Sequence, residues 1–357
     1  MLRLRNLLTN NPFVDNLKED KREVNMKLFK RTQYLAAASF LIAGALGAVS
    51  AQAESLRVAH SSNPGQSVYI YWDELAKRVN ERANGELELK VFPSGQLGGD
   101  EQVLRGLGSG TIHMGSNAAS NMGIVSDAYG WADLPYIFKS ADGAQAAFND
   151  PQISEFIGKK MRDDANTVVL GHIEVGGFRI LINTQRPLKT PDDVNGMKFR
   201  MLSNPIDQAL LSSWNASPIA MPWSETFVSI EQGVADGLQL QPQAIKGFGF
   251  DKMIRYGTFT DTLMTVHVAQ INADTWDGLS QEMKDIISTA SKEALDVANS
   301  ADRSDIAGIL EDLSGTIEFY EPTEAEFNQW RDAAMGIWPE FTGSMDQDIL
   351  ARVQEVQ

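Results

Sequence analysis

A strand candidate runs directly into a helix start in Gly196-Met197-Lys198-Phe199-Arg200-Met201-Leu202-Ser203-Asn204-Pro205. Residues 197–201 are strand-like. Asn204 provides a side-chain oxygen for an N-cap, and Pro205 fits the first helical turn, where its missing N–H costs nothing. Apolar residues then recur at helical spacing, at Ile206, Leu210, Leu211 and Trp214. The stretch therefore predicts a strand followed at once by an amphipathic helix.

The same alternation continues on both sides of this stretch. Upstream, residues 56–60, 86–92 and 112–114 are strand-like, and two segments with helical periodicity separate them. Residues 168–173 and 178–183 add two more strand candidates. Because helices alternate with strands, we expect an α/β fold with mixed, mostly parallel sheets flanked by helices.

Two helices are predicted near the carboxyl end. The longer begins at a Ser280 cap and continues through Ala301, about 30 Å at ~1.5 Å per residue, enough to lie across two domains. Thr323 and Glu326 have the spacing of a capping box for a last helix. No internal repeat or low-complexity linker separates the two blocks, so we expect them to be interwoven.

The first 53 residues have the pattern of a signal region. A basic start at Met26 precedes an uncharged run over 32–53 that ends in Ala51-Gln52-Ala53, the small-x-small pattern of a signal peptidase site. We therefore predict translation from Met26, a signal peptide over 26–53 and cleavage after Ala53. A transmembrane anchor is the alternative, because the run is about long enough to span a bilayer. Cleavage would leave a periplasmic protein with no direct membrane insertion.

Charge and cysteine content exclude several classes of protein. The 357 residues include 31 Lys+Arg and 47 Asp+Glu, a formal charge of -16, and no cysteine. Residues 1–53 hold eight of those bases and four of the acids, so the remainder carries a net charge of -20. Such a chain repels nucleic-acid phosphates and anionic lipids. Without cysteine it has no disulfide, thiolate metal site or thiol nucleophile.

Catalytic and cofactor motifs are missing from the sequence. The four histidines lack the HExxH spacing of zinc enzymes, and no Walker lysine or GxSxG elbow is present. We expect no catalytic residue, no metal and no cofactor, and hence no enzyme. Scattered acids that pair in space as a hydrolase dyad remain the alternative.

Several ordered motifs together resemble one family. They are Phe92-Pro93-Ser94-Gly95-Gln96-Leu97-Gly98-Gly99-Asp100, Leu134-Pro135-Tyr136, Gly177-Phe178-Arg179-Ile180, residues 196–202, Met221-Pro222-Trp223-Ser224-Glu225 and Gln232-Gly233-Val234-Ala235-Asp236-Gly237. In order and spacing, nearly all of residues 54–340 resembles the solute-binding proteins of tripartite ATP-independent periplasmic (TRAP) transporters, the DctP family.

The resemblance implies a two-lobed, type II-like clamp, with a long helix spanning both lobes. Lobe I would hold residues 54–176 plus about 266–305, and lobe II 177–265 plus about 306–357. It also implies capture of a small organic acid, a carboxylate or a sulfonate, and its delivery to small and large integral-membrane TRAP subunits. A periplasmic receptor subunit for a sensor, or a binder of a zwitterion or amine such as ectoine, is the alternative.

The resemblance also implies a set of binding residues. Arg200 matches the arginine that pairs with the solute carboxylate, and a guanidinium offers the planar fork that a carboxylate accepts. Arg179 matches a second arginine that assists, and Trp223 an aromatic residue that packs on the solute. Ser61 and Ser62 follow the first strand, where open α/β sheets place ligands. A structural role is the alternative for each of them.

Asn117 and two glutamines complete the predicted site. Asn117 follows the third strand, as Ser61 follows the first. Family members commonly read Asp-Gly-Gln-Glu-Asn-Pro where this chain has Asp236-Gly237-Leu238-Gln239-Leu240-Gln241-Pro242. Either Leu240 or Gln241 replaces the solute-binding Asn, depending on the alignment. Gln239 and Gln241 are therefore candidates, and the altered amide argues against carrying over a sialic-acid or simple dicarboxylate specificity.

Overall fold

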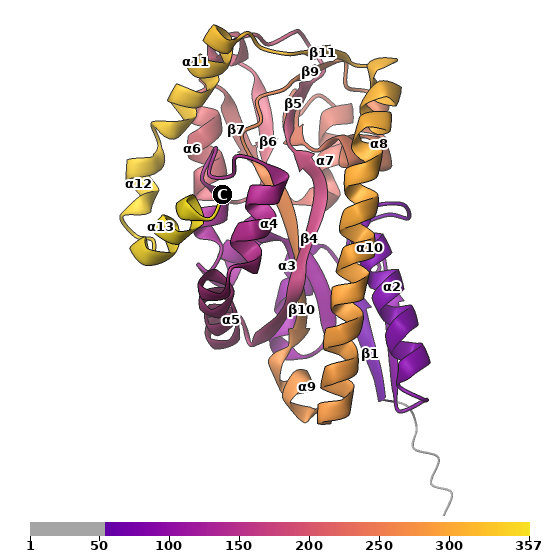
Figure 1. The fold of residues 1–357 in the computed structure, drawn as a ribbon. Coiled ribbons are helices and arrows are strands. Elements are labelled where there is room, and N and C mark those ends of the chain that lie inside the picture. Colours follow the sequence, from indigo (N-terminus) through magenta and orange to yellow (C-terminus); the bar gives the residue numbers. More distant parts are fainter. Residues whose placement is uncertain (1–53) are drawn as a thin grey trace, which may run out of the picture. The chain divides into compact units, whose positions relative to one another are not determined.

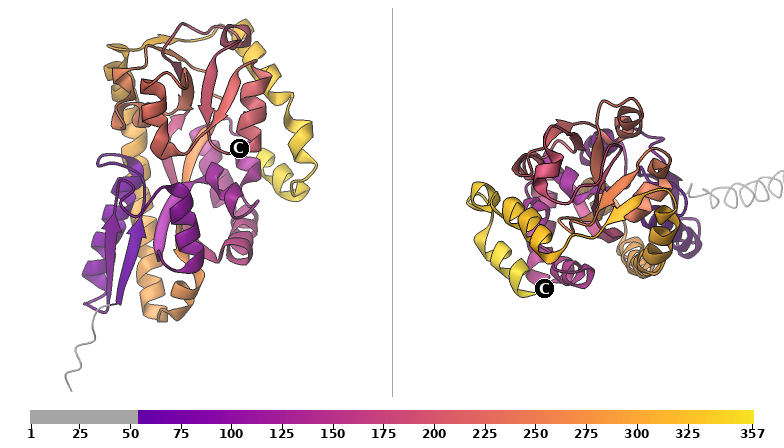
Figure 2. Two further views of the ribbon diagram at one scale, coloured as in Figure 1. Left: turned by 180° about the vertical axis from the view of Figure 1, so that it is seen from behind. Right: turned by 90° about the horizontal axis from the view of Figure 1, so that it is seen from above.

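The computed structural model describes residues 54–357, and every element below belongs to this part of the chain (Figures 1 and 2). The predicted signal peptide over 26–53, its start at Met26 and the cleavage site after Ala53 lie outside the described residues.

Five strands form the first sheet. Their order is β2 (Leu87–Phe92), β1 (Glu54–Ala59), β3 (Met114–Ala118), β10 (Met264–Asn272) and β4 (Thr167–Phe178). β1 pairs in parallel with β2 and β3, whereas β10 is antiparallel to β3 and β4. The third strand begins at Met114, slightly later than the pattern around 112–114 predicted.

Six strands form the second sheet. Their order is β11 (Glu318–Tyr320), β9 (Tyr256–Thr258), β5 (Ile180–Asn183), β8 (Gly237–Leu240), β6 (Lys198–Met201) and β7 (Ser217–Ala220). β6 is parallel to β7 and β8, and β5 is antiparallel to β8 and β9. Five of the nine strand pairings in residues 54–357 are parallel, so the sheets are mixed and mostly parallel.

Helices cover both sheets. They are α2 (Ser67–Arg82), α3 (Asp100–Ser109), α4 (Ala141–Asn149), α5 (Pro151–Ala165), α6 (Pro205–Ser213), α7 (Trp223–Glu231), α8 (Pro242–Gly247), α9 (Ala273–Gly278), α10 (Gln281–Ser314), α11 (Glu324–Met335), α12 (Trp338–Thr342) and α13 (Gln347–Glu355). Short 3-10 turns occur at η1 (Ala119–Ile124), η2 (Gly130–Asp133), η3 (Pro191–Val194) and η4 (Phe250–Lys252).

Buried apolar clusters hold these layers together. One lies between the first sheet, α2 and α10 and includes Trp72 and Ile287. A second packs α8 and the end of α10 on the second sheet around Leu238 and Leu313. The largest joins η2, α4 and α5 to α6, α11 and α13, and Trp330 belongs to it.

Helix α10 runs beside both sheets (Figure 1). It begins as predicted, because the Ser280 hydroxyl accepts a hydrogen bond from the Met283 N–H at 3.2 Å. It is longer than predicted, with 34 residues against an expected end at Ala301. Ile309 and Leu313 are buried against the second sheet, and this packing extends the helix to Ser314.

The chain crosses from one sheet to the other between β4 and β5. The two separate strands predicted at 168–173 and 178–183 are present as β4 and β5, but β4 extends to Phe178, and β5 begins at Ile180 and belongs to the other sheet. Gly176 and Gly177 have φ values of 65° and 73°, a left-handed conformation that glycine adopts without penalty. The Gly176 N–H donates to both carboxylate oxygens of Asp302 on α10, each at 2.8 Å. This crossing places Arg179 immediately before β5.

The carboxyl-terminal helices differ in part from the prediction. The capping box between Thr323 and Glu326 is present and starts α11. α11 ends at Met335, and α12 and α13, which the sequence did not predict, follow it. An ion pair of 2.7 Å between Arg352 and Asp150 fixes α13 beside α5.

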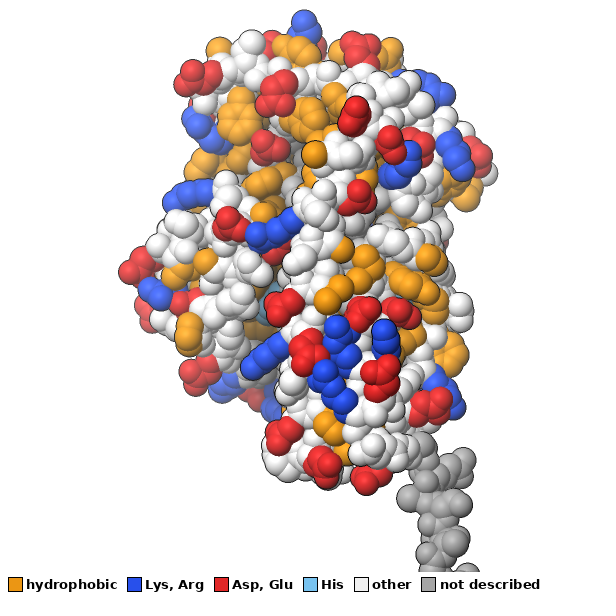
Figure 3. All heavy atoms as spheres, turned by 45° about the vertical axis from the view of Figure 1, so that its right-hand side comes forward, with side chains coloured by type: hydrophobic (Ala, Val, Ile, Leu, Met, Phe, Trp, Pro, Cys, Tyr) orange, Lys and Arg blue, Asp and Glu red, His pale blue; other side chains and the backbone are white. Residues whose placement is uncertain are grey.

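The surface over α10 and α2 carries charges of both signs. Acidic and basic side chains lie interspersed on the face shown in Figure 3. Arg82 and Glu293 form one such pair at 2.6 Å. None of the helices between residues 54 and 357 combines the length and hydrophobicity that a bilayer crossing requires.

Candidate functional site

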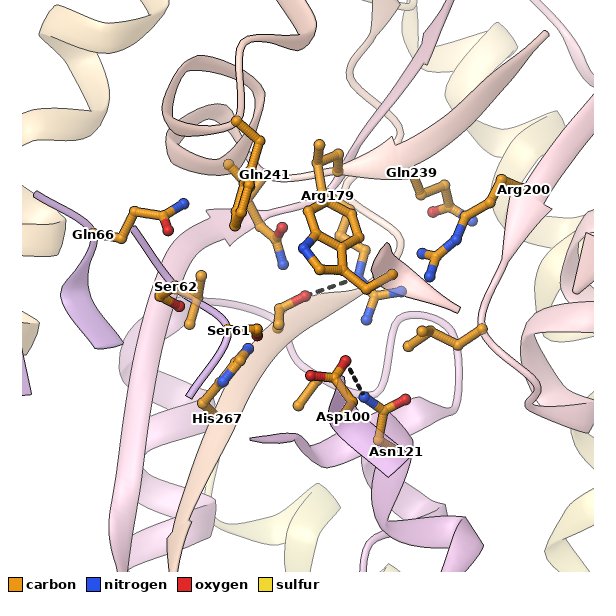
Figure 4. Close-up of a pocket in the computed structure, with 18 residues that line it drawn as sticks. Ser61, Ser62, Gln66, Asp100, Asn121, Arg179, Arg200, Gln239, Gln241 and His267 are labelled. Atoms are coloured by element: carbon orange, nitrogen blue, oxygen red, sulfur yellow. Dashed lines mark hydrogen bonds between the residues drawn. The ribbon is translucent and has the colours of Figure 1, made fainter. Parts of the chain in front are cut away.

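A cavity of about 90 Å³ lies between the two sheets. A single water needs at least about 10–15 Å³ on such a measure, so the cavity has room for several waters or one small organic molecule. Its walls come from both sheets and from the starts of α3, α7 and α8 (Figure 4). The lining residues are Ser61, Ser62, Gln66, Asp100, Ala118, Asn121, Val175, Arg179, Arg200, Leu202, Trp223, Gln239, Leu240, Gln241, Ala244, Phe248, Thr265 and His267.

Strand ends explain why these residues meet. β1 and β3 are parallel, and Ser61, Ser62 and Ala118 lie at their carboxyl ends. Arg200 and Gln239 lie on the parallel pair β6 and β8 of the second sheet. Carboxyl ends of parallel strands are the usual ligand edge of open α/β sheets.

Arg200 is a buried cation with few partners. Only 7% of the residue is exposed. Its Nη2 donates to the Met221 carbonyl at 3.0 Å, and its Nε has no partner in residues 54–357. Burial lowers the pKa of the guanidinium to about 10. A desolvated charge of this kind is costly unless an anion pairs with it, so the geometry favours an anionic ligand.

Arg179 is equally buried but is held from several sides. Its Nε donates to the Thr265 hydroxyl at 2.8 Å, and its Nη2 donates to the Ser120 hydroxyl at 3.2 Å. Its Nη1 lies 3.8 Å from Oδ2 of Asp207. Two of its five N–H groups therefore donate to the protein, and Nη1 lies beside a carboxylate.

Two buried carboxylates lie behind Arg179. Asp133 accepts hydrogen bonds from the Ser120 hydroxyl at 2.5 Å and from the Asn204 amide at 2.7 Å. Burial and the neighbouring Asp207 raise the pKa of Asp133 to about 6. Burial also raises the pKa of Asp207, against the attraction of Arg179 and Arg200.

A third carboxylate, Asp100, faces the cavity. It is the first residue of α3, and its Oδ2 accepts a hydrogen bond of 3.0 Å from the Asn121 amide (Figure 4). Burial raises its pKa, while Ser61 and Arg200 act in the opposite direction. The cavity thus presents a carboxylate as well as a guanidinium.

Aromatic rings close one wall. Trp223 is the first residue of α7, and the Arg200 guanidinium carbon lies 5.4 Å from its ring centroid, a cation–π distance. The Phe248 ring packs edge-on against Trp223 at 4.9 Å. Both residues also line a larger outer groove of about 520 Å³, so they separate the inner cavity from that groove.

Neutral polar groups complete the cavity. Burial lowers the pKa of His267 to about 3, so its imidazole is uncharged at neutral pH. The Nδ1 of His267 and the Oε1 of Gln239 have no hydrogen-bond partner in the described residues. These atoms are free to bond with a polar ligand. Residues 54–357 contain no cluster of His, Asp or Glu arranged to hold a metal ion.

Comparison with known proteins assigns the family. The family model for bacterial extracellular solute-binding protein, family 7 (DctP), matches residues 58–344. The chain belongs to this family. Among similar proteins, the 2,3-diketo-L-gulonate-binding periplasmic protein YiaO of Escherichia coli K12 is 27% identical over 72% of this chain and 78% of its own length. The C4-dicarboxylate-binding periplasmic protein DctP of Rhodobacter capsulatus is 25% identical over 79% and 84%.

Solved structures of TRAP periplasmic solute-binding proteins share the fold. A TRAP periplasmic solute-binding protein from Sulfurospirillum deleyianum, with bound succinate, superimposes with a TM-score of 0.80 at 25% identity. The superposition covers 85% of this chain and all of that one. A similar protein from Shewanella oneidensis gives a TM-score of 0.81 at 20% identity, covering 85% and 99%. The predicted two-lobed solute-binding fold is thereby confirmed.

Seven of the eight residues predicted for the family 7 site line this cavity. They are Arg200, Arg179, Trp223, Gln239, Gln241, Ser61 and Ser62. Asn117 is not among the lining residues, because its amide points to α3 and donates to the Asp100 carbonyl at 3.1 Å. Both Leu240 and Gln241 line the cavity, so the altered family motif belongs to the wall under either alignment.

Sequence reasoning missed several polar residues. Asp100 stands in the quoted motif over 92–100, but its position at a helix start did not indicate that it faces a cavity. Asp133, Asp207 and His267 carry no local signal, because distant segments bring them to the site.

Proposed function

We propose that this chain is the extracytoplasmic solute-binding subunit of a TRAP transporter and captures a small organic acid in the cavity between its sheets. The observation that carries the proposal is Arg200, a buried guanidinium that faces the cavity and forms no ion pair within residues 54–357. A carboxylate or sulfonate would satisfy its unpaired donors. Relatives named for 2,3-diketo-L-gulonate and C4-dicarboxylates, and a structure with bound succinate, support an acidic solute.

The other lining residues would orient the solute. Trp223 would cover its carbon skeleton, and Arg179 would strengthen the positive potential at the carboxylate. Gln239, Gln241, Ser61 and Ser62 would form hydrogen bonds with its polar substituents. Asn117 would act indirectly by fixing the start of α3.

Binding would favour a closed clamp. We assign residues 54–176 with about 266–305 to lobe I, and 177–265 with about 306–357 to lobe II, which follows the division of the strands between the sheets. The solute would contact both lobes, and a ligand shifts such an equilibrium only by its differential affinity for the two states. Closure would present a surface to the small and large membrane subunits, after removal of residues 1–53 on export to the periplasm.

The test uses protein exported from the full chain and purified without refolding. A thermal-shift screen over carboxylates, sulfonates and zwitterions would identify a solute, and calorimetry would measure its affinity. Arg200→Met should cost on the order of 3–5 kcal/mol of binding free energy, because it removes one partner of a buried charge pair. Arg331→Met, on the exposed face of α11, is the matched control and should bind normally.

Two results would contradict the proposal. Unchanged affinity in Arg200→Met would show that this guanidinium does not hold the solute. Conversion of the recovered solute to a product, in place of stoichiometric recovery, would indicate an enzyme.

A further inference from the structure

Acidic groups outnumber basic groups around the cavity. Arg179 and Arg200 are the guanidinium groups among the lining residues, while Asp100, Asp133 and Asp207 lie in or directly behind the wall. A cavity built for a dianion would be expected to carry the opposite balance.

The positive charge of Arg179 is largely neutralised from behind. Asp207 lies 3.8 Å from its Nη1, and Asp133 joins the same network through Ser120. Arg200 is left as the lining guanidinium that forms no ion pair within residues 54–357. The cavity therefore has the capacity to neutralise about one negative charge.

Asp100 presents an acceptor to the same solute. One carboxylate oxygen bonds with Asn121, and the group is drawn below Arg179 in the close-up of the cavity (Figure 4). Burial disfavours its charged form and raises its pKa, whereas Arg200 and the positive end of the helix dipole at the first turn of α3 favour that form.

From this arrangement we propose that Asp100 makes the cavity selective for a monocarboxylate whose distal end carries a hydrogen-bond donor, a hydroxyl or an ammonium, and excludes dicarboxylates. This inference rests on the proposed function, in which Arg200 holds the first carboxylate. A hydroxyl or an ammonium donates to the Asp100 carboxylate. A second carboxylate has no proton to donate and is repelled by the like charge.

The neutral polar groups nearby agree with this selectivity. The uncharged His267 and the amides of Gln239 and Gln241 add acceptors and donors suited to hydroxyl groups, and none of them adds a positive charge.

The test compares acids that differ at one end. Succinate, 4-hydroxybutyrate and 4-aminobutyrate share a chain length and differ in their distal carboxylate, hydroxyl or ammonium, and the three- and five-carbon sets repeat the comparison. Affinities are measured by calorimetry at pH 7.5 on the exported full chain. Asp100→Asn removes the charge and keeps the shape. Glu101→Gln is the matched control, since this exposed neighbour bonds with Arg105 and does not line the inner cavity.

For at least one chain length, a donor-bearing acid should bind at least about 10-fold more tightly than the diacid, and Asp100→Asn should reduce that ratio about 10-fold. If the amino acid binds more tightly than the hydroxy acid and Asp100→Asn removes this preference, the solute carries an ammonium. If the hydroxy acid binds as tightly as the amino acid, a hydroxyl is enough for recognition. The inference would be overturned if diacids bound as tightly as the donor-bearing acids, or if no acid bound at all. It would also be overturned if Asp100→Asn left the affinity ratio of donor-bearing acid to diacid unchanged. If Arg200→Met abolishes the binding of every acid while Asp100→Asn leaves all affinities unchanged, the proposed function is supported and only the selectivity is refuted.

Discussion

At the scale of single residues, the two arginines of the cavity carry the same charge in different surroundings. Arg179 has hydrogen bonds to Thr265 and Ser120 and an ion pair with Asp207. Arg200 has one carbonyl and an aromatic ring, and it interacts with Asp207 and Asp100 only beyond ion-pair distance. We therefore expect Arg179 to contribute to the stability of the protein, and Arg200 to contribute to the binding of the solute.

Arg200→Met should leave the solute-free protein as stable as the parent or more stable. The substitution removes a desolvated charge whose pKa burial lowers to about 10, and replaces it by an apolar side chain of similar length. The unfolding free energy, measured with urea in the absence of solute, should therefore not fall. A loss of more than about 1 kcal/mol, the net worth of one ordinary hydrogen bond, would mean that Arg200 is structural.

Arg179→Met should destabilise the solute-free protein by about 3–5 kcal/mol. It leaves the buried Asp207 without its basic neighbour, and removing one partner of a buried pair has this cost. The same urea titration measures it, with Arg331→Met as the surface control. Equal stabilities of the Arg179 and Arg200 variants would contradict the distinction between them.

Residues in recognisable motifs could be predicted from the sequence, and residues defined by tertiary contacts could not. Arg200, Trp223 and Gln241 lie in motifs with fixed spacing, and they do line the cavity. Asp207 sits on α6, seven residues beyond Arg200 with no motif of its own, and only the approach of Arg179 from β4–β5 gives it a partner. The sequence predicted that Asn117 follows the third strand, whereas it lies inside β3 and its amide points to α3, a direction that depends on tertiary packing.

At the scale of elements, the crossing from β4 to β5 depends on two adjacent glycines with different neighbours. A Cβ on Gly176 would lie 2.8 Å from the Cβ of Gln241, whereas a Cβ on Gly177 would lie 3.4 Å from Ile306. Gly177→Ala should therefore cost only the left-handed strain, about 1–2 kcal/mol. Gly176→Ala should cost more and also weaken solute binding about 10-fold, because it displaces Gln241 from the cavity wall.

Thermal unfolding and calorimetry on the two glycine variants provide the comparison. Each variant is the control for the other, since both introduce the same side chain at a positive φ. Equal losses of stability and affinity would show that the contact with α8 has no special role.

The bond between α10 and this crossing should depend on pH. Burial and the nearby Glu174 raise the pKa of Asp302 to about 6, so the folded protein binds a proton there more tightly than the unfolded chain does. The resulting stabilisation is complete below pH ~4 and is lost as pH rises to about 6, at most about 3 kcal/mol. Asp302→Asn keeps an acceptor for the Gly176 N–H but does not titrate.

Between pH 4.5 and pH 7, the unfolding free energy of the parent should therefore fall relative to that of Asp302→Asn. Urea titrations at several pH values measure it, and all other groups cancel in the comparison. A difference independent of pH would mean that Asp302 is ionised throughout.

Local signals predicted where elements begin better than where they end. The caps at Ser280, Asn204 and Thr323 correctly mark helix starts, because capping is a contact between near neighbours. The extension of α10 to Ser314 depends on packing against the second sheet, and the sheet change after β4 depends on glycine conformations. Local periodicity therefore predicts neither feature.

At the scale of the whole molecule, the negative charge should oppose the approach of an anionic solute without affecting its retention. Residues 54–357 carry a net charge of -20, whereas the site lies inside a cavity. Salt screens long-range repulsion and leaves a buried pair largely unscreened. Stopped-flow measurements between 0.01 M and 0.5 M salt should therefore show an association rate that rises several-fold and a nearly constant dissociation rate. An association rate that falls as salt increases would instead indicate that charges at the mouth of the cavity attract the solute.

Contacts between the two layers limit how the molecule can open. The Ser67 N–H at the start of α2 donates to Gln243 on α8 at 3.2 Å, and Asn204 reaches Asp133 from the other side of the cavity. Opening of the clamp would break both contacts. Both contacts therefore favour the closed form, and a solute that contacts both sides of the cavity would favour it further.

Trp223 gives the protein an optical signal of its own. All seven tryptophans lie in the described residues, and Trp223 is the one that lines the inner cavity, against Arg200 and Phe248. An arriving solute would change the polarity around this indole and leave the buried indoles of Trp72, Trp214 and Trp330 as they are. Emission from the unlabelled protein should therefore shift on binding, and Trp223→Phe should abolish the shift, so cargo can be screened without any attached dye.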